Sequence, residues 1–464
     1  MIVNPRRIAL LVSPVVKITQ VLVPCESIIV SFLPSVDSIV IDLPRKFTVS
    51  LYTPGATSTT SPLLAMSTAE LIDGISFGTM ASVGIFLKPL IAEFGWSRGN
   101  LSLGYTAIAF ASAVAGILWS IIVDRHGSRW VALFGAIAMG IPLLLLSRIE
   151  LLAEFYVYYF LFGALGHAAV TGPLWACVGL WFKNNVGLAL GVTFSGSAIG
   201  QGLVPYIARY LIDNFGWETA YSTLGMAYMI LAIPVALLVR DNPQRKKIQS
   251  NPPLNQKEEA SILLPPVIVV TWISLAVIFC CIAMSVVIVH LVPLLTDYGI
   301  TSENAVVIFM ILMFAGAFGR ILGGKLADLV GPLKSYIVMS LLQTSVVFIF
   351  PHIQSHFLFY VVAIVFGIAF SGVMASFLVC IRMMVPAGVL ARSMAVVAMF
   401  GWFGMGLGGW LGGLIFDLTG SYHWSFATGS ISGIVNLIIL FFFYIFIRRY
   451  RLNGNGYSAN YYSK

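Results

Sequence analysis

Long apolar runs alternate with short polar segments along most of the chain. A helix that crosses the ~30 Å hydrocarbon core of a membrane needs ~20 mostly apolar residues. Helix is expected in such runs because a backbone in lipid must satisfy its own hydrogen bonds. The runs of sufficient length are 71–92, 101–123, 130–147, 154–180, 187–212, 218–239, 267–296, 304–326, 334–351, 355–381, 392–416 and 424–447. The pattern therefore predicts an all-α membrane protein with 12 transmembrane helices.

Composition agrees with this prediction and excludes an ordinary soluble domain. Hydrophobic residues make up 59% of the chain and charged residues 9%, whereas about a quarter of the residues in a soluble domain are charged. The basic residues behind the net charge of +8 are scattered between apolar runs and form no patch, so no nucleic-acid partner is expected. The five cysteines show no metal-binding spacing, and no metal or cofactor is predicted.

The distribution of basic residues predicts the orientation of the spans. If the N-terminus is cytoplasmic, 21 of the 26 Lys and Arg residues fall on the cytoplasmic side. This bias predicts that both termini are cytoplasmic, in a plasma membrane or a bacterial inner membrane.

The one long polar stretch within the apolar region, 240–266, is rich in Pro, Asn and charge, and it is typical of a solvated linker. It divides the chain into a predicted N-terminal six-helix bundle, 66–239, and a C-terminal six-helix bundle, 267–447. A cytoplasmic tail, 448–464, would follow.

Residues 1–65 have a different character, since short β-branched runs are interrupted by proline about every ten residues and no run is long enough to span. Three interpretations stay open for this N-terminal extension. It is a disordered tail, a targeting segment, or the product of a mis-called start, with translation beginning at Met66.

An internal repeat appears when the chain is aligned with itself at an offset of 204 residues. The matches include turn and helix-end residues, which chance supplies less freely than Leu or Val. They pair Pro89 with Pro293, Gly95 with Gly299, Asp124 with Asp328, Gly127 with Gly331, Gly163 with Gly367, Gly200 with Gly404, Asp213 with Asp417, and Gly216 with Gly420. Two pseudo-symmetric six-helix bundles that enclose a site near the membrane midplane would produce this pattern, and such a scaffold favours transport over catalysis.

Two loops that match in this repeat carry charged residues suited to conformational gating. Asp124 and Asp328 each close a helix, a glycine follows, and Arg125 and Arg129 stand in the first loop. A carboxylate in this place can accept hydrogen bonds from a neighbouring helix N-terminus. The four residues are therefore predicted to form contacts that hold one conformation and break in the other. The alternative is that these charges only set topology.

The first of these loops resembles the G-x-x-x-D-R-x-G-R-R signature of the major facilitator superfamily. The sequence here reads Ser120-Ile121-Ile122-Val123-Asp124-Arg125-His126-Gly127-Ser128-Arg129, so the leading glycine and one basic position differ. The resemblance covers residues 67–450 and implies the major facilitator fold.

A finer resemblance is to the monocarboxylate transporter family and its microbial relatives of the oxalate/formate type. It rests on Trp181-Phe182-Lys183, Leu188-Ala189-Leu190-Gly191 and Gly196-Ser197-Ala198-Ile199-Gly200. The last two segments place glycines where the fifth helix can approach a neighbour closely. The resemblance implies transport of small carboxylates.

Arg320 is the strongest candidate for substrate binding. It lies about eight residues, or ~12 Å, inside the Asp328 end of the eighth span, where a cation is costly unless it faces water or a partner. Its planar fork can hold a carboxylate through two parallel hydrogen bonds. In the resembled family, an Arg four residues before the glycine of this helix end contacts the substrate carboxylate, and Arg320 stands in that relation to Gly324. A structural ion pair is the alternative.

Four more residues are candidates for the site. His167 can bind substrate or carry a proton, since histidine titrates near neutral pH, although packing is an equal alternative. Asp73, near the predicted inner end of the first span, is a second proton-coupling candidate. His290 and Trp402 are candidate substrate contacts; the alternatives are a gate or a solvated helix end for His290 and lipid or core packing for Trp402. The acid and the lysine that animal family members use for proton coupling are replaced here by Gly316 and Ala81.

The sequence thus predicts a secondary transporter of small carboxylates that works by alternating access, with monocarboxylate:proton symport favoured. The alternatives are an organic anion exchanger and a non-transporting membrane sensor with the same fold. An enzyme is disfavoured because no paired carboxylates, Ser/His/Asp set or His/Cys set stands at a helix end. The expected partners are a carboxylate, a proton and the lipid bilayer, with the protein a monomer or weak oligomer.

Overall fold

The computed structural model describes residues 8–12, 16–21, 60–181, 186–241, 264–385 and 387–452. Near the N-terminus, β1 (Ile8–Val12) and β2 (Val16–Val21) form an antiparallel hairpin. The rest of the described chain is helical. The helices of the first half are α1 (Thr60–Ala81), α2 (Val83–Phe94), α3 (Arg98–His126), α4 (Ser128–Leu146), α5 (Leu152–Leu161), the π-helix η1 (Phe162–His167), α6 (Ala168–Trp181) and α7 (Val186–Leu238). Those of the second half are α9 (Pro266–Asp297), α10 (Ser302–Val330), α11 (Pro332–Val347), the short 3-10 helix η3 (Phe350–His352), α12 (His356–Met384), α13 (Ala387–Thr419) and α14 (Tyr422–Leu452).

The helices of the described residues account for the 12 predicted spans. Ten helical segments are long and apolar enough to cross a membrane. One of them, Val192–Leu238, contains two helical runs that meet at Gly216, where φ is 84° and ψ is 165°. The continuous helical stretch from α5 through η1 to α6 adds a further span that the ten do not include. The fold of 12 transmembrane helices is thereby confirmed.

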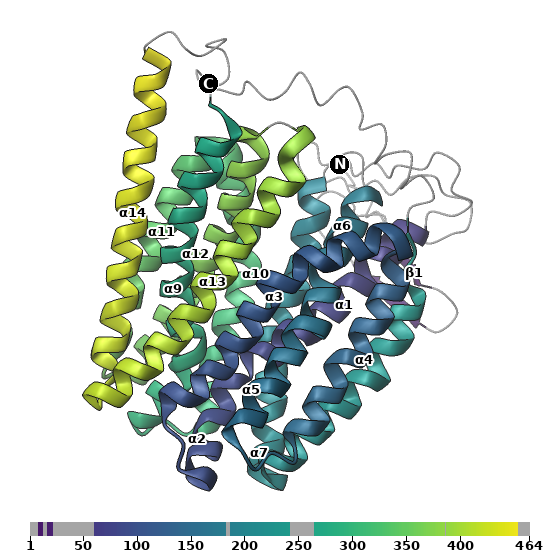
Figure 1. The fold of residues 1–464 in the computed structure, drawn as a ribbon, viewed down its shortest axis with the longest axis vertical. Coiled ribbons are helices and arrows are strands. Elements are labelled where there is room, and N and C mark those ends of the chain that lie inside the picture. The colour runs from purple at the N-terminus through teal and green to yellow at the C-terminus, as the bar shows by residue number, and fades with distance from the viewer. Residues whose placement is uncertain are drawn as a thin grey trace, which may run out of the picture.

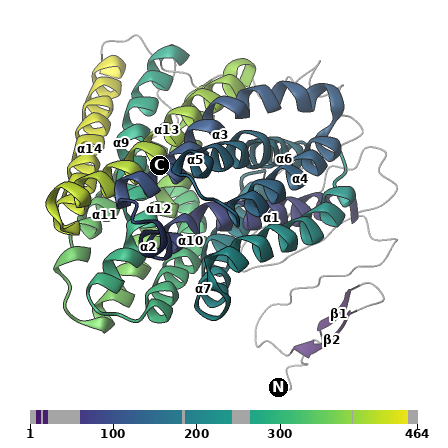
Figure 2. The same ribbon diagram turned by 60° about the horizontal axis from the view of Figure 1, so that its bottom comes forward.

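The two halves of the chain lie side by side, as the purple-to-teal and green-to-yellow helices show (Figure 1 and Figure 2). The positive-φ glycines form three pairs 204 residues apart, namely Gly95 and Gly299, Gly127 and Gly331, and Gly216 and Gly420. Helix contacts repeat at the same offset. Gly163 packs on the backbone of Ile108 just as Gly367 packs on that of Leu312. The sequence repeat is therefore a repeat of turns and of helix packing.

The first span begins earlier than its apolar run predicted. Helix α1 starts at Thr60, eleven residues before position 71, and α2 continues it after a short break at Ser82. Asp73 consequently lies 13 residues after the start of α1, or ~20 Å along the helix axis. It stands well within the span rather than near its end.

Small residues bring α1 and α7 into close contact. Gly74 packs against the backbone of Gly196, and Gly200 packs against the backbone of Gly74. No side chain stands between these backbones, so the two helices approach as membrane helices do at small-residue interfaces. This packing places the functional side chains of α1 beside those of α7 and, across the bundle, those of α10.

Candidate functional site

Arg320 extends from α10, in the second half, towards α7, in the first. Its Nη1 donates a hydrogen bond to the Ser197 hydroxyl at 2.7 Å. The Nε atom is buried, and among the described residues it has no hydrogen-bond partner. Arg320 lies ten residues, or ~15 Å, from the Val330 end of α10. A cation within the membrane, held at one nitrogen only, thus joins the two halves.

Asp73 on α1 supplies the opposite charge. It is fully buried, and its Oδ2 accepts a hydrogen bond from Trp175 Nε1 at 3.2 Å. Its Oδ1 has no partner among the described residues. The charges of Asp73 and Arg320 interact electrostatically, although the two side chains form no direct ion pair. A buried acid and a partly buried base therefore face the same region, each with one buried atom that has no hydrogen-bond partner among the described residues.

His167, at the end of η1, belongs to this cluster. Its Nδ1 lies 2.6 Å from the Ser76 hydroxyl, and its buried Nε2 has no partner in the described structure. Its ring stands edge-on to Phe77, with centroids 4.7 Å apart, and edge-on to Trp402 at 5.2 Å. A single turn of π-helix often marks a functional position, and here it ends on the imidazole.

The cluster contains four of the five residues predicted to bind substrate or to carry a proton, namely Asp73, His167, Arg320 and Trp402. Sequence reasoning missed Ser76 and Phe77, although they stand three and four residues after Asp73 and so share its helix face. It also missed Trp175 and Ser197. None of these four side chains carries a charge, so nothing distinguishes them in sequence from other residues of an apolar run.

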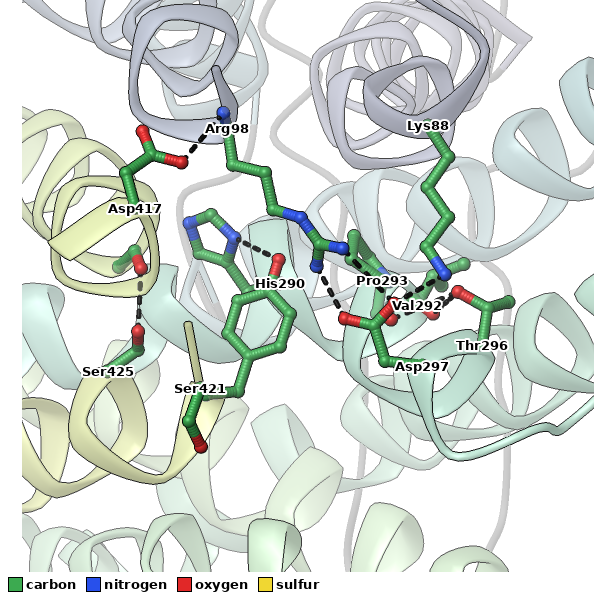
Figure 3. Close-up of polar contacts among 12 residues, drawn as sticks. Lys88, Arg98, His290, Val292, Pro293, Thr296, Asp297, Asp417, Ser421 and Ser425 are labelled. Atoms are coloured by element: carbon green, nitrogen blue, oxygen red, sulfur yellow. Dashed lines mark hydrogen bonds and ion pairs between the residues drawn. The ribbon is translucent and has the colours of Figure 1, made fainter. Parts of the chain in front are cut away.

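His290 lies apart from this cluster, towards the Asp297 end of α9. Its Nε2 is 2.8 Å from the Gly409 carbonyl oxygen, and its Nδ1 is 3.3 Å from the Tyr422 hydroxyl. The ring is fully buried and both nitrogens have partners. Its contacts lead to α13 and α14 and to the ionic network of Figure 3.

That network joins the halves at one end of the bundle. Asp297 of α9 receives two hydrogen bonds from the Arg98 guanidinium, at 2.6 and 3.1 Å, and an ion pair from Lys88 at 2.6 Å (Figure 3). The Arg98 side chain is only 15% exposed. A bidentate, partly buried pair of this kind is stronger than most surface ion pairs. Lys88 and Arg98 come from the first half and Asp297 from the second.

A second carboxylate extends this closure. Asp417 of α13 accepts hydrogen bonds from the backbone N–H groups of Arg98 and Gly99, at 3.1 and 2.7 Å. These groups open α3, where the helix dipole favours a negative charge. Further along the same contact, the Thr106 hydroxyl donates to the Gly406 carbonyl oxygen at 2.6 Å. The halves are thus held together along α3 and α13.

The opposite end of the bundle has a different polar arrangement. Asp241 accepts a hydrogen bond from the Ser128 backbone N–H at 2.8 Å, so an acid does approach the N-terminus of α4. Arg125 and Arg129 are exposed and form no salt bridge with the described side chains. The side chains of Asp124 and Asp328, the predicted gating acids, lie outside the described residues.

Comparisons with known proteins agree with this architecture. The Major Facilitator Superfamily profile matches residues 71–354 and 321–457. Monocarboxylate transporter 13 of Rattus norvegicus is 24% identical over 75% of this chain and 81% of its own length. MFS-type transporter 1 of Ophiocordyceps sp. (strain BCC 1869) is 24% identical over 59% of this chain, and the match spans only 60% of that relative's length.

A solved structure of a bacterial homolog of the human lysosomal transporter Spinster, in an inward-facing and occupied conformation, has the same fold. Its TM-score is 0.65 at 16% identity, and the match covers 87% of this chain and all of that one. The resemblance inferred from the loop signature is confirmed. The profile match extends over most of the chain, and this multi-pass membrane protein therefore belongs to the Major Facilitator Superfamily.

Proposed function

We propose that this protein is a secondary transporter that carries a monocarboxylate together with a proton. The observation that carries the proposal is Arg320, which lies between the halves with only Nη1 bound to a protein group. On the other edge of its fork, the buried Nε has no hydrogen-bond partner among the described residues. Carboxylates pair with such an edge through two parallel hydrogen bonds. A single fork suits one carboxylate.

Charge balance favours symport with a proton. With Asp73 ionised, its charge and that of Arg320 cancel in the empty site. A bound carboxylate would leave one net negative charge in the membrane interior, where an uncompensated charge costs several kcal/mol. One proton, placed on Asp73, restores neutrality. The loaded site would then carry the same net charge as the empty one, and both could cross between conformations.

Alternating access follows from the two ends of the bundle. The Asp297 end is closed by contacts between the halves. The distribution of Lys and Arg supports an extracellular or periplasmic position for this end, with both termini cytoplasmic. Rocking of the halves would break the Asp297 and Asp417 contacts and expose Arg320 to that side. The loops that carry Arg125, Arg129, Asp124 and Asp328 would separate or meet at the other end.

Uptake into proteoliposomes tests this function. The purified full-length protein should accumulate labelled monocarboxylate when the outside is more acidic than the lumen. Accumulation should approach about tenfold for one pH unit, because one proton per anion converts a tenfold proton ratio into a tenfold anion ratio. Uptake that requires a trapped internal anion and ignores the pH gradient would indicate an exchanger. Binding without flux would indicate a sensor.

The role of Asp73 can be tested separately. Asp73→Asn removes the charge that opposes Arg320, so a carboxylate should still bind while the proton site is lost. We expect exchange of internal for external carboxylate to continue and pH-driven accumulation to fall to the level of protein-free liposomes. His167→Gln is the comparison. If it abolishes pH-driven accumulation and Asp73→Asn does not, His167 carries the proton instead.

A further inference from the structure

Aromatic rings from both halves surround the polar cluster. The Phe77 ring is stacked near Trp175, with centroids 6.2 Å apart and planes at 16°, and near Trp402 at 5.7 Å and 30°. The Phe194 ring stands edge-on to Trp175 at 4.7 Å. These rings come from α1, α6, α7 and α13, so they meet only because the helices of both halves bring them together.

Hydrogen bonds tie this aromatic group to Arg320 and Asp73. The hydroxyl of Ser197 accepts from Arg320 and donates to the Phe194 carbonyl oxygen at 2.7 Å. The indole N–H of Trp175 donates to Asp73. Through Ser197 and Asp73, the guanidinium and the aromatic group are therefore linked in one cluster.

The residues of the cluster fall into a fully buried set and a partly exposed set. Asp73, Ser76 and His167 are fully buried. Arg320 and the four rings of Phe77, Trp175, Phe194 and Trp402 are each partly exposed. A ligand could consequently contact Arg320 and the four rings, whereas Asp73, Ser76 and His167 are buried beneath the surface.

We propose that the transported carboxylate carries a planar, apolar ring. The inference rests on the proposed function and specifies its substrate class, an aryl-substituted monocarboxylate. The carboxylate would pair with Arg320, and the ring would lie against Phe77 and Trp402, because aromatic rings favour offset-stacked and edge-to-face contacts. A small aliphatic acid would satisfy the fork but would make little contact with the exposed part of these rings. Asp73 is fully buried, so we assign it to proton binding and not to the binding of a substrate ammonium.

Lactate and phenyllactate are a matched pair for the test, since they differ by one phenyl group. Uptake and binding by the purified full-length protein should favour phenyllactate at least about tenfold, a ratio within reach of one buried ring. Phenylalanine, which adds an ammonium in place of the hydroxyl, should compete more weakly than phenyllactate. Equal or stronger competition by phenylalanine would overturn the assignment of an uncharged aryl acid.

Variants of Trp402 test whether this ring produces the preference for phenyllactate over lactate. Trp402→Ala should bring the phenyllactate-to-lactate ratio close to one, and Trp402→Phe should keep most of the preference, which guards against a folding defect. Trp424→Ala is the matched control, because that indole is 64% exposed and belongs to α14, a helix that contributes no residue to the cluster. Equal affinity for both acids in the unmodified protein would overturn the inference and leave carboxylate transport standing. Failure to transport either acid would overturn the proposed function itself.

Discussion

Replacement of Arg320 by Gln is expected to reduce carboxylate uptake at least about 100-fold. The variant keeps a side chain that can hydrogen-bond to Ser197, but it removes the cation and the second edge of the fork. Two charge-assisted hydrogen bonds contribute about 1.5–3 kcal/mol each, so their joint loss exceeds a hundredfold change in affinity. Initial uptake rates over a range of substrate concentrations measure the effect, and direct binding to purified protein shows whether affinity is the cause.

Two further variants separate charge from geometry. Arg320→Lys keeps the cation and loses the planar fork, and we expect partial activity with a raised KM. Arg209→Gln is the control, because Arg209 pairs with Asp213 on its own helix and lies away from the site. Uptake by Arg320→Gln at the level of the Arg209→Gln control, for every carboxylate tried, would remove Arg320 from the binding site.

The helices and their duplication could be predicted because membrane burial imposes a simple rule on composition. Each predicted span corresponds to a helical stretch, and three of the five glycine pairs found at the offset of 204 residues reappear as paired turns with positive φ. Glycine tolerates this backbone region at little cost, so a turn position leaves a trace in the sequence that a Leu or Val position does not.

The start of the first span was predicted too late because hydropathy treats hydroxyl residues as polar. The segment before position 71 contains Ser67 and Thr68, whose hydroxyls donate to the Leu64 carbonyl oxygen. A serine or threonine that bonds back to its own helix can lie within a span without an unsatisfied group. The helix therefore continues through them, and Asp73 is carried deep into the bundle.

The site was only partly predictable, since composition gives the depth of a residue but not the helix face it occupies. Arg320 could be identified because a deep cation must have a partner or water. His290 is likewise a titratable residue within an apolar run. Its side chain, however, contacts Tyr422 and the Gly409 carbonyl oxygen and not the cluster around Arg320. Phe77 and Trp175 resemble any other aromatic residue in an apolar run, and only the packing of four helices reveals that they surround a charge.

The polar groups in the middle of the bundle differ from those at its Asp297 end in whether their hydrogen bonds and charges are satisfied. In the middle of the bundle, Arg320 and Asp73 keep unsatisfied atoms between the halves. At the Asp297 end, every described carboxylate that crosses between the halves is bound by a cation or by backbone N–H groups. Unsatisfied groups can accept a substrate, whereas satisfied ones hold a conformation. The second arrangement leads to a prediction about Asp297.

Asp297→Asn is expected to open this end of the bundle. The amide carries no charge, so Lys88 and Arg98 lose their common counter-ion and face each other as like charges. A loss of about 1.5–3 kcal/mol from the closed state corresponds to a change of roughly 10- to 100-fold in the ratio of open to closed protein. Thr106, which bonds to the Gly406 carbonyl oxygen between the halves, provides a reporter position. In a background with all five native cysteines replaced by alanine, the alkylation rate of Thr106→Cys should rise at least about tenfold.

Asp213→Asn is the matched control for this experiment. It removes an acid near the same end of the bundle, but Asp213 pairs only with Arg209, four residues earlier on α7, so both partners belong to one half. The alkylation rate of Thr106→Cys should then stay within about twofold, because a pair within one helix opposes no movement between the halves. Equal rates in the two variants would show that the Asp297 contacts do not hold the halves together, and the closure would have to reside in the backbone bonds to Asp417 and in the apolar packing of α3 on α13.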